Sequence, residues 1–118
     1  MIMAGGRDVH RGEVFLGNMA GAGSRLWKNR PVLVVQNDIG NRYSPETIVV
    51  AIRSGPDTRH LPIRTPIPKG EGGLDQDSFV DAGQIVTLRK DALGRRLGRL
   101  SPDAMAGVDR ALRISLGL

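Results

Sequence analysis

The sequence predicts a mainly β (α+β) fold, a small β-barrel closed by one C-terminal helix. Short apolar runs rich in Val and Ile recur along the chain, and clusters of Gly, Pro, Asn and Asp separate them. Runs of this kind, bounded by turn formers, are typical of strands. Only the C-terminal segment has the spacing of an amphipathic helix. The 118 residues suffice for one hydrophobic core and are too few for two, so we expect a single domain.

Seven short segments are predicted to be strands: residues 13–16, 31–36, 47–52, 60–64, 78–80, 84–88 and 97–100. The segment 31–36 contains four successive apolar residues without alternation, so both faces of that strand should be buried. Pro62 lacks a backbone donor, which demotes its segment to an edge strand. The segments 78–80 and 84–88 are expected to join near Gly83.

The segments between these strands are rich in turn formers. Residues 1–10 are expected to form a flexible leader before one domain that spans 11–118. Residues 17–29 and 66–73 should be long loops, and loops of this length in a compact domain are usually functional or disordered. Residues 37–46 carry Asn, Asp, Gly, Ser and Pro, which predicts a polar loop built from turns.

The clearest helix begins after Ser101. Ser101 is a suitable N-cap, Pro102 fits the first helical position, and Asp103 adds negative charge to the first turn. Apolar side chains then follow at spacings of three and four, at Met105, Val108, Leu112 and Leu116. This spacing gives one apolar stripe along the helix.

The composition limits the classes of molecule that the chain is expected to bind. The chain carries a net charge of +5 and is richer in arginine than in lysine, which suits nucleic acid, an acidic protein or an anionic surface; arginine-favouring codon usage is the alternative explanation. Cysteine is absent, so neither disulfides nor a thiolate metal site is expected. No stretch is apolar enough to cross a membrane, and the N-terminus lacks a signal-peptide pattern, so we expect a cytoplasmic protein.

Arg30 is the first candidate for chemistry. It stands at the start of the predicted buried strand 31–36, and rigid elements hold reactive groups better than loops do. A guanidinium fixed there could stabilise a phosphate. The alternative is a surface arginine that ends the strand through a salt bridge.

Several segments resemble the MazF/PemK (Kid) toxin endoribonucleases: RGEV at 11–14, RPVLVVQNDIGNRYSP at 30–45, DS at 77–78, QIVT at 84–87 and the tail at 108–116. The resemblance covers nearly the whole chain from residue 11. It implies an SH3-like barrel, a homodimer and an acidic, MazE-like antitoxin, with DNA contacted only indirectly through that antitoxin. It also implies cleavage of single-stranded RNA without a metal or other cofactor, the 2′-OH being the nucleophile.

The resemblance places Arg30 at the family's catalytic arginine, for transition-state charge and proton transfer. The family's second catalytic residue is a Thr or Ser just after the strand matching 47–52. Here Arg53 occupies that position and Ser54 follows. Successive strand residues point to opposite faces, so Ser54 can replace the hydroxyl only if Gly55-Pro56 ends the strand early. Otherwise Arg53 supplies a second cation, or it simply faces solvent and the enzyme is weak.

The predicted loop 17–29 matches the family's loop over the RNA site. Trp27 could stack on a base while Ser24, Arg25 and Lys28 contact the backbone. A tryptophan buried against the barrel is the alternative.

Weaker RNA-binding candidates lie elsewhere: Asn37, Asp38, Asn41, Gln84 and Thr87. Turn-forming hydrogen bonds explain the first three better, and ordinary strand polarity could explain the other two. His10 and His60 lie outside the matched motif, and no acidic pair or His cluster has metal-ligand spacing. Two other functions stay open: a toxin of the same fold that binds a protein target, as CcdB-like relatives bind gyrase, and an RNA-binding module whose nuclease activity has lapsed.

Overall fold

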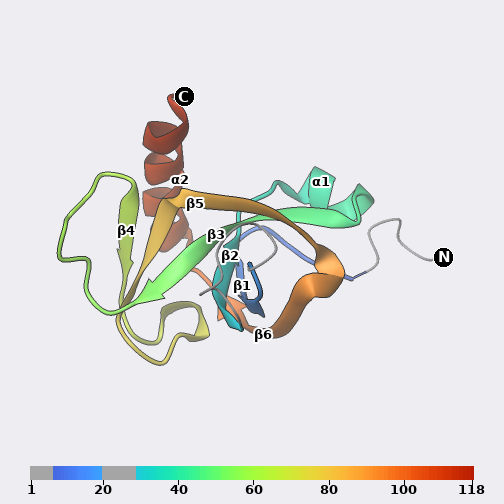
Figure 1. Ribbon diagram of the computed structural model, residues 1–118, viewed down its shortest axis with the longest axis horizontal. Helices are drawn as coiled ribbons and strands as arrows, with labels where there is room; N and C mark the ends of the chain where they lie inside the picture. The colour runs from blue at the N-terminus through green and yellow to red at the C-terminus, as the bar shows by residue number, and fades with distance from the viewer. Residues whose placement is uncertain (1–6, 20–28) are drawn as a thin grey trace.

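The computed structural model describes residues 7–19 and 29–118, and its centre is one antiparallel sheet of six strands in the order β4-β5-β3-β2-β1-β6 (Figure 1). The strands are β1 (Glu13–Gly17), β2 (Arg30–Val34), β3 (Glu46–Ser54), β4 (Arg64–Ile67), β5 (Ser78–Arg89) and β6 (Leu93–Arg99). Within these residues the sheet stays open between β4 and β6. The predicted mainly β fold with a C-terminal helix is confirmed.

Strand β2 lies in the middle of the sheet, between β1 and β3, and both of its faces are buried. Val32 and Val34 pack into one apolar cluster with Phe15 and Val49. Leu33 packs into a second cluster, on the other face, with Val50. The continuous apolar run in the sequence predicted this two-sided burial. Consequently the strand that begins at Arg30 is held in place from both sides.

Strand β5 differs from its prediction. The sequence indicated two strands joined near Gly83, whereas β5 is one strand of 12 residues. Its pairing with β3 is interrupted: Val50 faces Ile85, but Ala51 faces Asp81, so residues 82–84 are passed over. They form a bulge, in which extra residues on one strand are left out of the ladder. Gly83 therefore marks a bulge within one strand and not a turn between two strands.

The edge strands also shift. The edge strand expected at 60–64 lies later in the chain: β4 begins at Arg64, and its last two residues, Pro66 and Ile67, fall in the segment expected to be a loop. It is an edge strand, as expected. The brief strand expected at 97–100 is β6, which begins earlier, at Leu93. Two short 3₁₀ helices, η2 (Glu71–Gly73) and η3 (Lys90–Ala92), precede β5 and β6.

The loop predicted at 37–46 contains a short helix, α1 (Asp38–Tyr43). The Asn37 side chain accepts a hydrogen bond from the Gly40 backbone N–H at 2.8 Å and so caps the helix. Polar residues that favour turns also favour helix N-caps, which is why the sequence suggested turns alone.

The C-terminal helix α2 (Pro102–Leu116) is confirmed with its N-cap, since Ser101 accepts a hydrogen bond from Ala104 N–H. It packs against β4 and β5, and Val108 is fully buried in the second cluster. Leu116, the last residue of the predicted stripe, is 56% exposed instead. None of the helices in the described part of the chain is long and apolar enough to cross a membrane.

The leader predicted at 1–10 lies partly outside the described residues. Of its described part, Val9 is buried in the first cluster, and the Arg7 guanidinium donates to the Leu93 carbonyl at 2.5 Å.

Candidate functional site

A recess of about 460 Å³ opens at the end of β2 where Arg30 stands. It is lined by Leu16, Arg30, Pro31, Ile52, Ser54, Gly73, Leu74, Asp75, Gln76, Ser78, Arg95, Arg96 and Leu97. Apolar residues of the second cluster form part of its wall, and its polar lining includes three arginines and two serines. The sequence-based candidates Arg30 and Ser54 thus meet in one recess.

Ser54 reaches this recess without the early strand end that the sequence seemed to require. It is the last residue of β3, directly opposite Ser78 of β5, and Ile52 shares its face. The Ser54 side chain makes no hydrogen bond to another described residue. Arg30 is the first residue of β2 and can therefore line the recess from the strand end.

Arg53 lies on the opposite face of β3. Val32 faces Ala51 across β2 and β3, and the same register continued by two residues brings Arg30 opposite Arg53. Arg53 does not line the recess; its Nε lies 3.7 Å from the buried Asp81 carboxylate on β5. The two residues that the sequence could not rank are therefore both near Arg30, on different faces of one strand.

Several residues of the recess were missed by sequence reasoning, among them Arg95 and Arg96 of β6 and Asp75 before β5. Arg96 donates from Nε to the Glu13 carboxylate at 2.6 Å, which fixes it on β1. The sequence predicted a strand here only from residue 97, because in the pattern LGRRLGR at 93–99 glycine and arginine replace the usual β-branched residues. A strand assignment from residue 93 would have placed both arginines beside β1.

The remaining polar groups of the recess come from the segment before β5. The Ser78 hydroxyl donates to the Gln76 carbonyl at 3.0 Å, and Asp75 supplies a carboxylate. Guanidiniums can bind a phosphate and stabilise charge that develops on it, whereas hydroxyl and carboxylate groups can hydrogen-bond or move a proton. The set suits chemistry on a phosphodiester.

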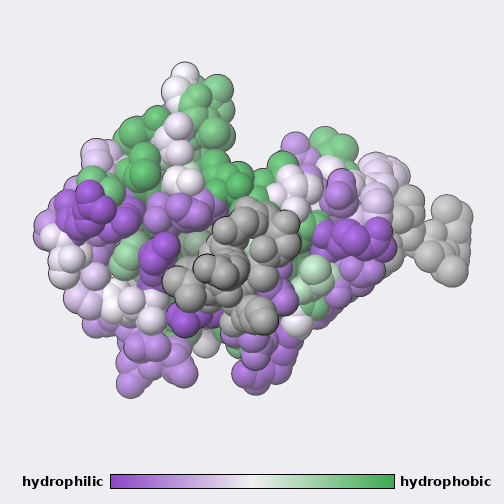
Figure 2. Space-filling view, in the orientation of Figure 1, coloured by the Kyte–Doolittle hydropathy of each residue, from purple (hydrophilic) through white to green (hydrophobic). Residues whose placement is uncertain are grey.

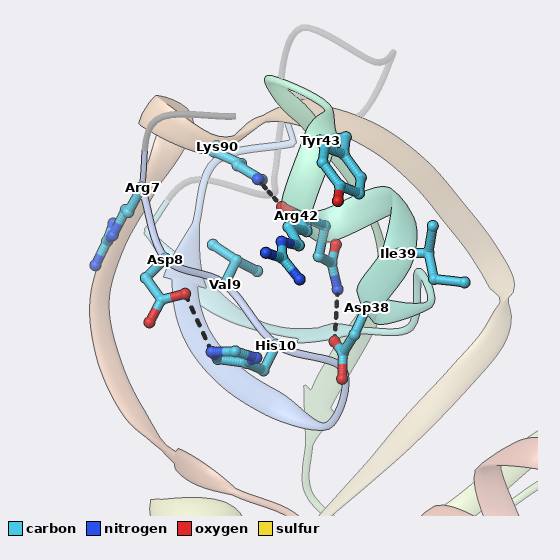
Figure 3. A pocket seen from close by; sticks show the side chains of 10 residues that line it. Arg7, Asp8, Val9, His10, Asp38, Ile39, Arg42, Tyr43 and Lys90 are labelled. Atoms are coloured by element: carbon cyan, nitrogen blue, oxygen red, sulfur yellow. Dashed lines mark hydrogen bonds and ion pairs between the residues drawn. The ribbon is translucent and has the colours of Figure 1, made fainter. Parts of the chain in front are cut away.

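A second recess, of about 610 Å³, lies beyond the other end of β2 (Figure 3). Its lining comes from residues 7–10, from α1 and from Lys90, and Figure 3 shows these side chains around one hollow. Most of its polar groups bond to one another. Asp8 pairs with His10 at 3.1 Å, and the buried Lys90 ammonium donates to the Asn41 carbonyl. Burial lowers the pKa of Lys90.

The RNA-binding candidates on α1 have structural partners. Asn41 is 2% exposed, and its side chain bonds to Gln36, Asp38 and Thr47. Asp38 accepts a hydrogen bond from Arg11 N–H at 2.7 Å. That bond, helped by Asn41, lowers the pKa of the Asp38 carboxyl even though partial burial opposes the change.

The other candidates are distributed differently. Gln84 and Thr87 are exposed on β5, and Gln84 belongs to the bulge. Ser24, Arg25, Trp27 and Lys28 lie outside the described residues. His60 is exposed and lines none of the recesses described above. In residues 7–19 and 29–118 no three His, Cys, Asp or Glu side chains come together as metal ligands.

Comparison with known proteins gives consistent matches. Residues 10–116 match the family described as PemK-like, MazF-like toxin of type II toxin–antitoxin system. The chain is 43% identical over 111 residues to endoribonuclease MazF of Staphylococcus epidermidis, covering 93% of this chain and 92% of that protein.

Two solved structures are similar in both sequence and fold. An endoribonuclease from a mycobacterial species matches with a TM-score of 0.78 and 28% identity, over 95% of this chain and 94% of that one. A mycobacterial endoribonuclease in complex with its cognate antitoxin matches with a TM-score of 0.79 and 28% identity, over 93% and 96% of the two chains.

Proposed function

The chain belongs to the PemK-like, MazF-like toxins of type II toxin–antitoxin systems and is an endoribonuclease, and we propose that it cleaves single-stranded RNA in the recess between Arg30 and Ser54. The observation that carries the proposal is that Arg30, at the start of a rigid central strand, and Ser54 line one recess with two further arginines. These groups match what phosphodiester cleavage needs.

The proposed reaction is an internal transesterification. The RNA 2′-oxygen bonds to phosphorus, the bond from phosphorus to the 5′-oxygen breaks, and the products are a 2′,3′-cyclic phosphate and a 5′-OH. One proton leaves the 2′-OH and one reaches the departing 5′-oxygen. Catalysis then depends on holding the strand in line, on moving these protons and on stabilising the extra negative charge on phosphorus.

Within this scheme Arg30 stabilises the charge. A guanidinium stays protonated in proteins and offers several donors in one plane, so it suits the phosphoryl oxygens better than it suits the role of base. Ser54 takes the position of the hydroxyl partner, and the Asp75 carboxylate at the same recess is available to accept a proton. No metal is required by these roles.

The antitoxin is proposed to be an acidic, MazE-like protein. The net charge of +5 supports a negatively charged partner, and a related mycobacterial endoribonuclease has been solved with its cognate antitoxin. An acidic segment that lies on Arg30, Arg95 and Arg96 would exclude RNA by occupying the same cations. Any contact with DNA would then pass through the antitoxin.

A homodimer is the expected assembly, with the end of α2 in its interface. Figure 2 shows apolar surface over this helix, where Ile114, Leu116 and Leu118 are between 56% and 86% exposed. Exposed apolar groups this close together mark contact surfaces more often than free ones. Light scattering on the purified protein should give twice the mass of one chain, and Leu116→Lys should lower it to one.

The decisive experiment incubates the purified protein with a long unstructured RNA in EDTA. We expect cuts at defined sites with 2′,3′-cyclic phosphate and 5′-OH ends, and a loss of roughly 10²- to 10³-fold in kcat for Arg30→Ala, as for other preorganised donors. Arg42→Ala at the second recess is the matched control and should cut at the parent rate.

The other outcomes separate the alternatives. Equal rates for Arg30→Ala and the parent protein would contradict this mechanism. RNA binding without cuts would favour a non-catalytic RNA-binding module. Neither binding nor cutting would favour a protein target.

A further inference from the structure

Three charged side chains from neighbouring strands share the face of the sheet opposite the Ser54 recess. Asp81 of β5 is paired with Ala51 of β3 on one side and with Arg64 of β4 on the other. Arg53 lies diagonally across from Asp81 on that same face, within the reach of a long side chain. The resulting row runs Arg53, Asp81, Arg64 across three strands.

Asp81 is buried between the two guanidiniums. Its side chain is 7% exposed, and one oxygen lies 3.7 Å from Arg53 Nε and 3.9 Å from Arg64 Nε. The other oxygen accepts the Gly83 N–H from the bulge at 2.9 Å. A carboxylate this buried must be paired, and the bulge fixes its direction.

Arg64 has a closer carboxylate partner than Asp81. Its Nη1 lies 3.1 Å from Asp57, and its guanidinium also stacks over the Phe79 ring at 4.9 Å. Arg64 is therefore held independently of Asp81. Arg53 is 47% exposed, and the buried Asp81 carboxylate lies 3.7 Å from its Nε. A carboxylate fixed in this place can direct the Arg53 guanidinium.

Arg53 also has a cation next to it. The β2–β3 pairing begins at Val32 and Ala51, and the same register continued by two residues brings Arg30 across from Arg53. Like charges on facing positions of neighbouring strands repel. Asp81 offsets this repulsion from the far side of Arg53. A phosphate that lies over both guanidiniums would offset it from the near side.

We propose that Asp81 is a positioning residue, which holds the Arg53 guanidinium beside Arg30 so that Arg53 binds a phosphate of the RNA strand next to the one that is cut. This role rests on the proposed function, since it needs an RNA strand at Arg30. It gives Arg53 a place in binding, while Ser54 serves the chemistry from the other face.

Simple electrostatics makes the opposite prediction. Removing a negative charge beside RNA-binding cations should strengthen RNA binding. If Asp81 positions Arg53, its neutralisation should weaken binding instead. The sign of the change therefore separates the two ideas.

The test is a double-mutant cycle with Asp81→Asn, Arg53→Ala and the double variant. Binding is measured with a 2′-O-methyl RNA strand that spans one mapped cut site and cannot be cut. Each single variant should weaken binding and reduce the slope of log K against log salt by about 0.7, the value for one lost phosphate contact on a single strand. The double variant should have the same RNA affinity and salt slope as Arg53→Ala. For cutting, KM should rise more than kcat falls.

Asp57→Asn is the matched control, because it removes the stronger acid from Arg64 and leaves Asp81 with Arg53. It should keep the parent salt slope. Tighter binding by Asp81→Asn, additive effects in the cycle, or the same slope change in Asp57→Asn would each overturn the proposal. Should Asp81→Asn fail to fold, Asp81→Glu replaces it in the cycle. It keeps the charge but moves the carboxylate by one methylene, so weaker binding and a smaller salt slope are expected, and parent-like binding and slope would overturn the proposal. Parent protein that cuts no RNA would instead contradict the proposed function.

Discussion

The two recesses at opposite ends of β2 differ in size and in what their polar groups do. The larger one, at α1 and Lys90, has about 610 Å³, and most of its polar side chains bond to each other or to the backbone. The smaller one, at Arg30, has about 460 Å³ and gathers three arginines with serine hydroxyls. The chemistry of the lining residues, more than the volume, favours the smaller recess as the RNA site that we propose.

The difference has a physical origin in the chain. Residues around α1 must cap a helix of six residues and satisfy the buried Asn41, so their polar atoms are used in folding. At the Arg30 recess, Arg30 and Ser54 stand at strand ends and Arg95 and Arg96 lie within β6, where pairing with β1 holds the backbone. Side chains there can face a substrate.

After Arg30→Ala, Ser54→Ala should have the largest effect on kcat, and it tests the difference between the two recesses. If the hydroxyl takes part in proton transfer or bonds to the reacting phosphate, kcat should fall by about 10²-fold. Ser44→Ala, beside α1, is the control and should leave kcat unchanged, because its hydroxyl accepts the Glu46 N–H and Ser44 is not among the residues that line the Arg30 recess. Single-turnover cleavage of a mapped RNA measures both. A normal rate for Ser54→Ala together with an inactive Arg53→Ala would show that Arg53, and not Ser54, is the second catalytic residue beside Arg30.

A second effect should appear in stability alone. Asn41→Ala leaves several buried groups without partners, and we expect the free energy of unfolding to drop by about 2 kcal/mol or more, with kcat of the folded protein unchanged. Asn37→Ala should cost about 1 kcal/mol through the lost helix cap. Urea unfolding and cleavage assays separate the two properties. A changed cut-site preference at unchanged stability would show instead that Asn41 contacts bases.

The smallest expected effect is a pH dependence from Asp38. Its folded pKa is lowered, so its ionised form contributes stability above the ordinary value of 3.8, and this contribution is lost as the pH falls through the lowered value. Asp38→Asn should therefore have a lower Tm than the parent protein at neutral pH. The difference should shrink in acid below pH 3.8. A constant difference across this range would mean that the carboxylate charge is not involved.

The sequence predicted the centre of the molecule better than its periphery. Buried apolar runs define β2 and β3 because burial leaves few acceptable residues, and Ser101-Pro102 define the start of α2 because capping is local. Strand β6 was predicted only in its second half, because its glycines and arginines have low strand propensity and the neighbouring strand β1 determines its conformation. Arg30 was identified as a candidate from its strand, but the face of Ser54 depends on where β3 ends relative to β5. That relation is tertiary and has no local signal.

The bulge in β5 determines which face of the sheet the side chains of each half of that strand point to. Asp81 and Ile85 are an even number of residues apart and would share a face in a regular strand, yet the bulge of three residues puts them on opposite faces. Without it, Asp81 would point toward the side of Ser54, away from Arg53. An insertion or deletion at 82–84 can therefore rearrange the charges around the proposed RNA site without replacing any charged residue. The length of this strand can thus change how the enzyme binds RNA.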